Sequence, residues 1–239
     1  PRHPSRQEHP VHVPDGFLDA PTSLGTAVVA AAAVGVALRG ARRELDDRTA
    51  PLAGLVALFV FATQMLNFPI GAGTSGHLLG GALAAVLVGP FTATLAITVV
   101  LIVQAILMAD GGITALGTNI TLMGIIGVWV GWSVFKLVQA VLPKRVSMVV
   151  PAAAAGALVS VPVAAFGFAA LFALGGNADV PFATVATAMV GVHVVIGIGE
   201  AAITAMAVAS IVLTRPDLVY GAKSVLAQRE LTIRTAVSA

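Results

Sequence analysis

The stretch Phe91–Ala109, "FTATLAITVVLIVQAILMA", carries no charged side chain and is long enough to cross a lipid bilayer as one helix. A spanning helix needs about 20 mainly apolar residues, whereas a spanning β-strand alternates apolar and polar residues over about ten. This run is continuous and therefore predicts a transmembrane helix. The whole chain agrees, because 58% of its residues are apolar, 10% are charged and the mean hydropathy is +0.97. Such a composition excludes a soluble domain and predicts an all-α, polytopic membrane protein.

Further apolar runs, bounded by glycine, proline or charge, bring the expected number of spans to about seven. The expected spans are Pro21–Arg39, Pro51–Asn67, His77–Gly89, Phe91–Ala109, Ile113–Leu142, Ser147–Leu174 and Phe182–Thr214. The third is short, which suggests a partly re-entrant or strongly packed segment. The fifth and the seventh are long enough to tilt or to extend beyond the bilayer.

The distribution of basic residues predicts the orientation, because cytoplasmic loops are enriched in lysine and arginine. With seven spans and the N-terminus outside, eleven of the 13 basic residues lie in inner loops or at inner helix ends. Arg2 and Arg6 alone lie outside. We therefore expect an N-terminal extension at 1–10, one transmembrane domain at 11–214 and a cytoplasmic basic tail at 215–239. The basic segments would contact anionic lipid or a partner subunit.

Two histidines are expected on the outer face. His12 lies in "VHVPDGFLDAPTS" (Val11–Ser23), and His77 lies in "NFPIGAGTSGHLLGG" (Asn67–Gly81). Imidazole is the commonest ligand of zinc, copper, nickel and cobalt, and no cysteine is present to supply a thiolate. A lone loop histidine is more often a surface residue than a ligand. Two on one face, each between glycine and proline turns, leave metal binding and surface exposure as equal interpretations.

The glycine-rich loop predicts how His77 would be presented. A loop of this kind can fold back at membrane depth where it lines a cavity enclosed by protein. A helix beginning at His77, capped by Thr74 or Ser75, would place the imidazole at the cavity floor.

At this point the sequence resembles a known family. "HVPDGFL", "NFPIGAGTSGHLLGG" and "DGGITALGTNITLMG" (Asp110–Gly124) are similar to the signatures of the CbiM/NikM proteins, and "GIGEAAITA" (Gly197–Ala205) matches as well. These are the substrate-binding S components of energy-coupling-factor transporters for cobalt and nickel. The resemblance extends from about Val11 to the end of the last span and implies a membrane component that imports Co²⁺ or Ni²⁺.

The resemblance also implies a ligand set. The metal would be held by the backbone nitrogen of Val11 as a terminal amine, by the backbone and imidazole nitrogens of His12, and by His77. Four nitrogens in a plane favour Ni(II) or Cu(II). The family begins at Met-His, whereas ten residues precede Val11 here. We expect Val11 to be the native start, translated as methionine, and residues 1–10 to be absent from the native protein.

Partners follow from the same resemblance: a transmembrane coupling subunit, two ATPase subunits and a small two-span accessory protein. No G-x-x-x-x-G-K-[ST] motif occurs, so ATP would be hydrolysed by the partners and this chain would not be an enzyme. Nucleic-acid binding has no support. The short segment after the last span favours cobalt, for cobalamin synthesis, whereas the planar nitrogen site alone favours nickel.

Several polar residues lie near the outer ends of the spans: Asn67, Thr74, Ser75, Gln104 and Asn119. Gln104 and Asn119 would hydrogen-bond the ligand imidazoles and fix their orientation. The alternative is helix–helix hydrogen bonding without a role in metal binding. For the outer carboxylates, including Asp15 and Asp110, solvated loop positions are the simpler interpretation.

Two ionisable residues lie inside the last expected span. His193 and Glu200 are seven positions apart and therefore face the same side of a helix. Ionisable residues within a membrane are costly and are functional by default. The pair would form a proton relay or a structural lock. The relay supports an alternative function, a proton-coupled secondary transporter for a divalent metal or small solute.

Overall fold

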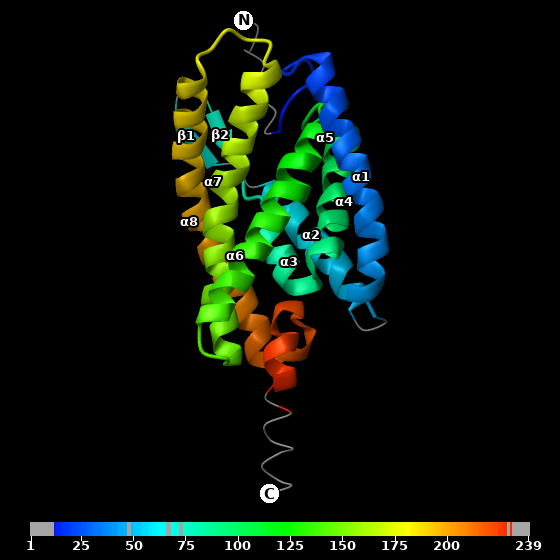
Figure 1. Cartoon of the computed structure of the whole chain (residues 1–239), viewed down its shortest axis with the longest axis vertical. Helices are drawn as coiled ribbons and strands as arrows, with labels where there is room; N and C mark the ends of the chain where they lie inside the picture. Colours follow the sequence, from blue (N-terminus) through cyan, green and yellow to red (C-terminus); the bar gives the residue numbers. More distant parts are fainter. Residues whose placement is uncertain (1–11, 47–48, 66–67, 72–73, 229, 231–239) are drawn as a thin grey trace, which may run out of the picture.

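The computed structural model describes residues 12–46, 49–65, 68–71, 74–228 and 230, with the backbone alone described at 68–71 and 74–76. Long helices run roughly along one axis and form an elongated bundle (Figure 1). They are α1 (Ala20–Glu44), α4 (Pro90–Leu107), α7 (Val149–Gly175), α8 (Phe182–Thr214) and the combined segment Leu116–Val141. The start of α1 and the connection between α7 and α8 lie at one end of the bundle, and the C-terminal helices lie at the other (Figure 1).

Five helices of the described residues are long and apolar enough to cross a membrane, and α2 (Ala50–Gln64) is a shorter apolar helix. Large apolar side chains are exposed along the outside of the bundle; Leu24, Leu55, Leu107, Leu137 and Leu213 are 63–83% exposed. Such a surface is stable against lipid tails but not against water. The prediction of an all-α, multi-pass membrane protein is therefore confirmed.

The third expected span is shorter than predicted. Helix α3 (Gly81–Val88) has 8 residues, and all of them are buried. Residues 77–80 are not helical, so the prediction of a helix beginning at His77 is wrong. The N-cap of α3 is Gly80, in the left-handed region at φ 74, rather than the predicted Thr74 or Ser75. Strong packing of this segment, in contrast, is confirmed.

The glycine-rich segment before His77 forms a short antiparallel hairpin. Strand β1 (Phe68–Gly71) pairs with β2 (Thr74–Gly76), with Phe68 opposite Gly76. The sequence predicted a folded-back loop here, and the hairpin gives that reversal a defined register. Beyond β2 the chain continues as segment 77–80, which is buried and has no regular secondary structure.

The fifth expected span is one continuous helix of three types. It consists of α5 (Leu116–Asn119), the π-helix η1 (Ile120–Gly127) and α6 (Val128–Val141). It begins at Leu116 rather than at the predicted Ile113. π-helical turns are rare and frequently occur at functional sites. Here η1 carries Leu122 and Met123, which line the cavity described below.

The first span extends beyond its predicted end at Arg39 and ends at Glu44, which is 4% exposed. The Glu44 carboxylate accepts hydrogen bonds from the backbone N–H of Phe91 at 3.1 Å and of Thr92 at 2.7 Å. These N–H groups open α4 and have no partner within the helix. A residue that the sequence assigned to an inner loop therefore caps another helix.

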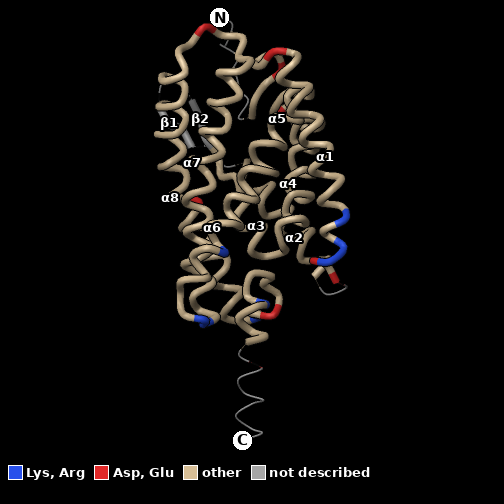
Figure 2. Tube along the Cα trace, in the orientation of Figure 1, with Lys and Arg blue, Asp and Glu red and all other residues tan. Residues whose placement is uncertain are grey.

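The end of the bundle opposite His12 is closed by short 3₁₀ helices. They are η2 (Val146–Met148), η3 (Pro216–Leu218) and η4 (Tyr220–Ala222). Part of the predicted tail is thus packed, and Gln139 donates from Nε2 to the carbonyl of Gly221 at 2.9 Å. Lysine and arginine gather in the half of the bundle toward the C-terminus (Figure 2), which is the asymmetry that the sequence predicted.

Candidate metal centre

The segment that carries His12 is fixed at its far end by helices α1 and α7. Asp19 is the N-cap of α1, and its carboxylate accepts from the backbone N–H of Thr22 at 2.9 Å. The backbone N–H of Asp19 donates to the carbonyl of Gly175 at 2.6 Å. Phe17 packs against Phe168 and Phe172 of α7, with ring centroids 5.7 and 5.5 Å away. The residues that follow the turn "PDG" are therefore packed against α1 and α7.

The same segment is tied to the turn between α4 and α5. The carboxylate of Asp15 accepts from both the backbone N–H (2.7 Å) and the hydroxyl (2.6 Å) of Thr114. These hydrogen bonds, from the side chain and then the backbone, lower the pKa of Asp15. The carbonyl of Val13 accepts from the N–H of Gly112 at 2.9 Å. Asp15 is an exposed loop carboxylate, as the sequence suggested, and its hydrogen bonds to Thr114 also attach the segment to this turn.

Asn119 completes this docking. Its amide oxygen accepts from the backbone N–H of Val13 at 3.1 Å, and its Nδ2 donates to the Val13 carbonyl at 3.2 Å. The side chain therefore mimics a strand partner for the residue after His12. The expected hydrogen bond from Asn119 to an imidazole is replaced by one to the backbone beside it. Asn119 itself is 4% exposed.

His12 points into the protein, and its side chain is 1% exposed. Its Nδ1 lies 3.3 Å from Oδ2 of Asp110, and its backbone nitrogen lies 3.4 Å from Oδ1 of the same carboxylate. Carboxylates in this position orient histidines that bind metals. Sequence reasoning placed Asp110 among the solvated loop carboxylates and missed this contact. The available signal was its place at the start of a matched signature.

His77 lies next to His12, with ring centroids 4.6 Å apart and the ring planes inclined by 55°. Nδ1 of His77 is 2.9 Å from the carbonyl oxygen of Leu78. Because a carbonyl only accepts, Nδ1 carries the proton and Nε2 keeps a free lone pair. The neutral imidazole is the form that ligates metals. The two predicted histidines are thus brought together.

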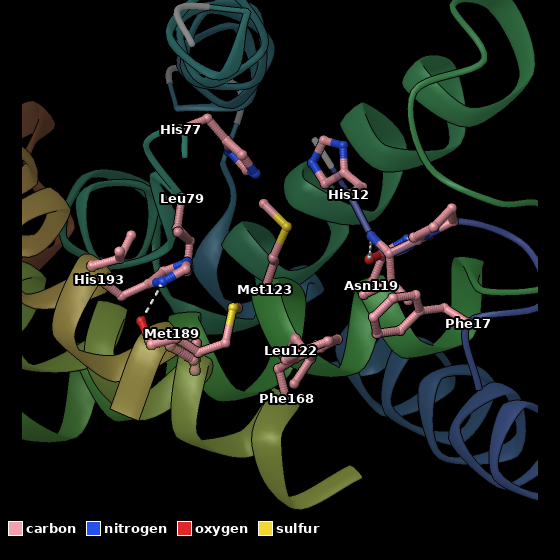
Figure 3. A pocket seen from close by; sticks show the side chains of 16 residues that line it. His12, Phe17, His77, Leu79, Asn119, Leu122, Met123, Phe168, Met189 and His193 are labelled. Carbon is pink, nitrogen blue, oxygen red and sulfur yellow. Dashed lines mark hydrogen bonds between the residues drawn. The ribbon is translucent and has the colours of Figure 1, made fainter. Parts of the chain in front are cut away.

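A cavity of about 350 Å³ opens beside the two rings. Figure 3 shows Met123 of η1 extending toward the space between His12 and His77. The opposite wall comes from α7 and α8 and includes Phe168, Met189 and His193. Most of the lining is apolar, so a cation that enters would lose its water and depend on the imidazoles.

The two ionisable residues of the last span have separate partners. His193 reaches the carbonyl of Met189 through Nδ1 at 2.7 Å, one turn earlier in α8. The Glu200 carboxylate accepts from the backbone N–H groups of Leu79 and Gly80. Among the described residues, no hydrogen bond or ion pair joins His193 to Glu200. The expected relay or lock between them is not formed in this structure.

The remaining predicted site residues do not reach the described part of the cavity. Gln104 is fully buried, and its backbone carbonyl accepts from the backbone N–H groups of Met108 and Asp110, both at 3.1 Å. It shapes the turn that carries Asp110. Thr74 and Ser75 are described as backbone in β2. Val11 and Asn67 lie outside the described residues.

Family comparison agrees with this geometry. The sequence profile described as "CbiM: Cobalt uptake substrate-specific transmembrane region" matches residues 12–218. The chain belongs to the CbiM family. This family resemblance was predicted from the quoted motifs and is confirmed. As a CbiM-family member, the chain is a multi-pass membrane component of cobalt or nickel transport.

Individual relatives extend the comparison. The CbiM-family chain is 40% identical to a putative metal transport protein of Haloquadratum walsbyi, over 88% of this chain and 94% of the relative. It is 36% identical to a putative fused nickel transport protein NikMN of Archaeoglobus fulgidus, over 87% of this chain and 68% of the relative. It is 35% identical to the cobalt transport protein CbiM of Sorangium cellulosum, over 78% of this chain and 83% of the relative.

A solved structure shares the fold. It is titled "Crystal Structure of an Truncated Transition metal Transporter" and superposes with a TM-score of 0.76 at 30% identity. The match covers 84% of this chain and 97% of that one. The CbiM-family fold described here is therefore also that of a transition-metal transporter.

Proposed function

We propose that this CbiM-family chain is the substrate-binding component of an energy-coupling-factor transporter that imports Co²⁺ or Ni²⁺. The observation that carries the proposal is the buried pair His12 and His77, whose ring centroids lie 4.6 Å apart beside a cavity. Asp110 orients one ring and Leu78 the other. Two neutral imidazoles in an apolar pocket select a borderline transition metal over oxygen-seeking Mg²⁺ or Ca²⁺.

Two imidazoles do not complete a coordination shell. Among the described residues, no group of three or more histidine, cysteine or acidic side chains forms a metal site. We propose that the other two ligands are backbone nitrogens, namely the deprotonated amide of His12 and the amine of residue 11 as the native N-terminus. The backbone nitrogen of His12 lies 3.4 Å from Oδ1 of Asp110 and would lose its proton when it binds the ion. Four nitrogens would then surround the ion in a plane.

Energy and direction would come from partners. The proposed assembly adds a transmembrane coupling subunit, two ATPase subunits and a small two-span accessory protein, and this chain would catalyse no reaction itself. The basic half of the bundle shown in Figure 2 would face the cytoplasm, so the His12 end would face outside. Metal would be captured from outside and released inward. We favour cobalt, supplied to cobalamin synthesis, over nickel.

The test is the intact mass of the untagged protein expressed from its native gene, followed by metal analysis of the same sample. A chain that starts with methionine at position 11 and carries one equivalent of Co²⁺ or Ni²⁺ supports the proposed site. A chain that retains residues 1–10 and still binds metal refutes the amine ligand. A chain with the expected start that binds neither ion, measured by calorimetry, refutes the proposed function.

A further inference from the structure

We propose that Glu200 is a positioning residue of the metal site, and that it fixes from α8 the loop that presents His77. This inference rests on the metal binding proposed above and assigns a role to a buried carboxylate that the ligand set does not use. Glu200 is the one charged residue in α8, and it is 2% exposed. A carboxylate inside a membrane protein is costly and requires a compensating function.

The contacts of Glu200 converge on two consecutive backbone groups. Oε2 accepts from the N–H of Leu79 at 2.6 Å, and Oε1 accepts from the N–H of Gly80 at 3.0 Å. Both oxygens are therefore used, one for each N–H. The residues that they hold are the second and third after His77.

This loop has few other ways to satisfy its backbone. Residues 77–80 lie between β2 and α3 without regular structure, and His77, Leu78 and Leu79 are 7%, 3% and 5% exposed. Buried N–H groups without a partner destabilise the folded protein. Gln64 completes the bracket, because its Nε2 donates to the Leu79 carbonyl at 2.9 Å. Glu200 therefore accepts from the backbone N–H groups of Leu79 and Gly80, and Gln64 donates to the backbone carbonyl of Leu79.

The loop in turn holds the imidazole. Nδ1 of His77 bonds to the carbonyl of Leu78, which belongs to the same peptide group as the Leu79 N–H held by Glu200. If Leu79 and Gly80 shift, the Leu78 carbonyl shifts with them and the His77 ring loses its orientation toward His12. Groups that orient a ligand in this way typically contribute 10–100-fold to metal affinity.

The arrangement also links the metal site to α8. The same helix carries His193 and Met189 on the wall of the cavity beside His12 and His77. A displacement of α8 would move Glu200 and, through its hydrogen bonds to the loop, would move His77. A metal bound by His77 would in turn restrain α8 through the same hydrogen bonds. Glu200 therefore transmits movement between this helix and the ligand loop.

The chain contains a matched control. Glu44 is also buried, at 4% exposed, and also accepts from two consecutive backbone N–H groups, those of Phe91 and Thr92 in the first turn of α4. It differs in place, because α4 begins at the end of the bundle opposite His12 (Figure 1). Substitutions of Glu44 should therefore reproduce the loss of stability without the loss of metal affinity.

The experiment uses the full-length protein in lipid nanodiscs and Ni²⁺ alone as the probe. Glu200→Gln keeps the length of the side chain and one acceptor oxygen, Glu200→Asp keeps the charge but not the reach, and Glu200→Ala removes both. Glu44→Gln and Glu44→Ala are the controls. For each variant, we would measure the Kd for Ni²⁺ by calorimetry, the d–d absorption of the bound ion, and the melting temperature.

We expect Glu200→Asp and Glu200→Ala to weaken Ni²⁺ binding by about 10–100-fold and to change the absorption spectrum at saturation. The affinity of Glu200→Gln should lie between those of these two variants and that of the wild type. The Glu44 variants should melt at a similarly lowered temperature with unchanged Kd and spectrum. Wild-type affinity in Glu200→Ala would overturn the inference. Wild-type affinity in Glu200→Asp together with weakened binding in Glu200→Gln would also overturn it, because that pattern would show that the charge of the side chain rather than its position matters.

A measurement on the wild type guards against variants that fail to fold. Ni²⁺ should slow amide hydrogen exchange in the loop 77–80 and also in the part of α8 around Glu200. Protection confined to the loop would overturn the link to α8. If the wild type binds neither Ni²⁺ nor Co²⁺, the proposed function fails rather than this inference.

Discussion

Nδ1 of His12 lies 3.3 Å from Oδ2 of Asp110, and the backbone nitrogen of the same histidine lies 3.4 Å from Oδ1. One carboxylate therefore contacts both the imidazole ring and the backbone nitrogen of His12. The carbonyl of Gln104 fixes the turn that carries this carboxylate. The imidazole is thus oriented before any metal arrives, which lowers the conformational cost of binding.

Replacing Asp110 should therefore weaken metal binding without unfolding the protein. We expect Asp110→Ala to reduce the affinity for Ni²⁺ and Co²⁺ by about 10–100-fold, with Asp110→Asn in between because it keeps one acceptor. Calorimetric titration in detergent measures both. Asp179→Ala, at an exposed acidic residue between α7 and α8, controls for the loss of surface charge. Equal affinities of Asp110→Ala and Asp179→Ala would contradict the role of Asp110.

The three histidines of the cavity should not be equivalent. His77→Ala removes a proposed ligand and should reduce bound metal below detection. His193→Ala removes a ring whose Nδ1 is paired with the Met189 carbonyl in its own helix, so affinity should remain close to that of the wild type. Metal analysis of the purified variants measures both outcomes. If the loss occurs in His193→Ala instead, the ion binds on the α8 side of the cavity.

Most of the helical frame could be predicted from the sequence, because continuous apolar runs specify membrane helices regardless of tertiary context. The exceptions have local causes. A helix could not begin at His77, since Gly80 adopts φ 74 and ends any helical path before Gly81. The π-helix Ile120–Gly127 has no sequence signal that apolar periodicity would reveal. The predicted end at Arg39 was too early because Glu44 is withdrawn from water by capping α4.

The structure brings His12 and His77 together, as the sequence predicted, but the residues that hold these two side chains were not predicted. His12 and His77 stand out because imidazoles are rare in an apolar chain and both lie in glycine- and proline-rich segments. Asp110 was marked only by its place in a matched signature, and Glu200 only as an ionisable residue inside a span; neither signal named a partner. Their roles depend on backbone N–H groups and a ring nitrogen that are far away in the sequence, and only the tertiary fold brings these together. The pairing expected between His193 and Glu200 failed for the same reason.

The contact between Asp15 and Thr114 should depend on pH in one direction. The folded-state pKa of Asp15 is lowered, so its stabilising effect is fully present above its unfolded pKa of about 3.9 and is lost as the pH falls through the folded value. The difference in melting temperature between the wild type and Asp15→Asn should therefore stay constant from about pH 8 to pH 5 and shrink toward pH 3. Thermal unfolding across this range measures it. A difference that changes near neutral pH would assign the effect to another group.

Gly111 should be essential to the site for two separable reasons. It adopts φ 93, and a Cβ there would lie 2.8 Å from Cβ of His12 and 3.2 Å from Nδ2 of Asn119. Gly16 shares the left-handed backbone at φ 74, but a Cβ there would meet nothing within 4 Å. An alanine at either position therefore costs about 1–2 kcal/mol of backbone strain, whereas only Gly111→Ala pushes against the ligand.

We accordingly expect Gly111→Ala to weaken Ni²⁺ binding by about tenfold or more, and Gly16→Ala to leave the affinity unchanged while lowering the melting temperature by a similar amount. Calorimetry and thermal unfolding of both variants separate the two effects. Because the strain is common to the pair, a difference in affinity reports the displacement of His12 itself. Equal affinities would show that the segment can move aside without disturbing the metal, and that the close packing of Gly111 against His12 does not position the ligand.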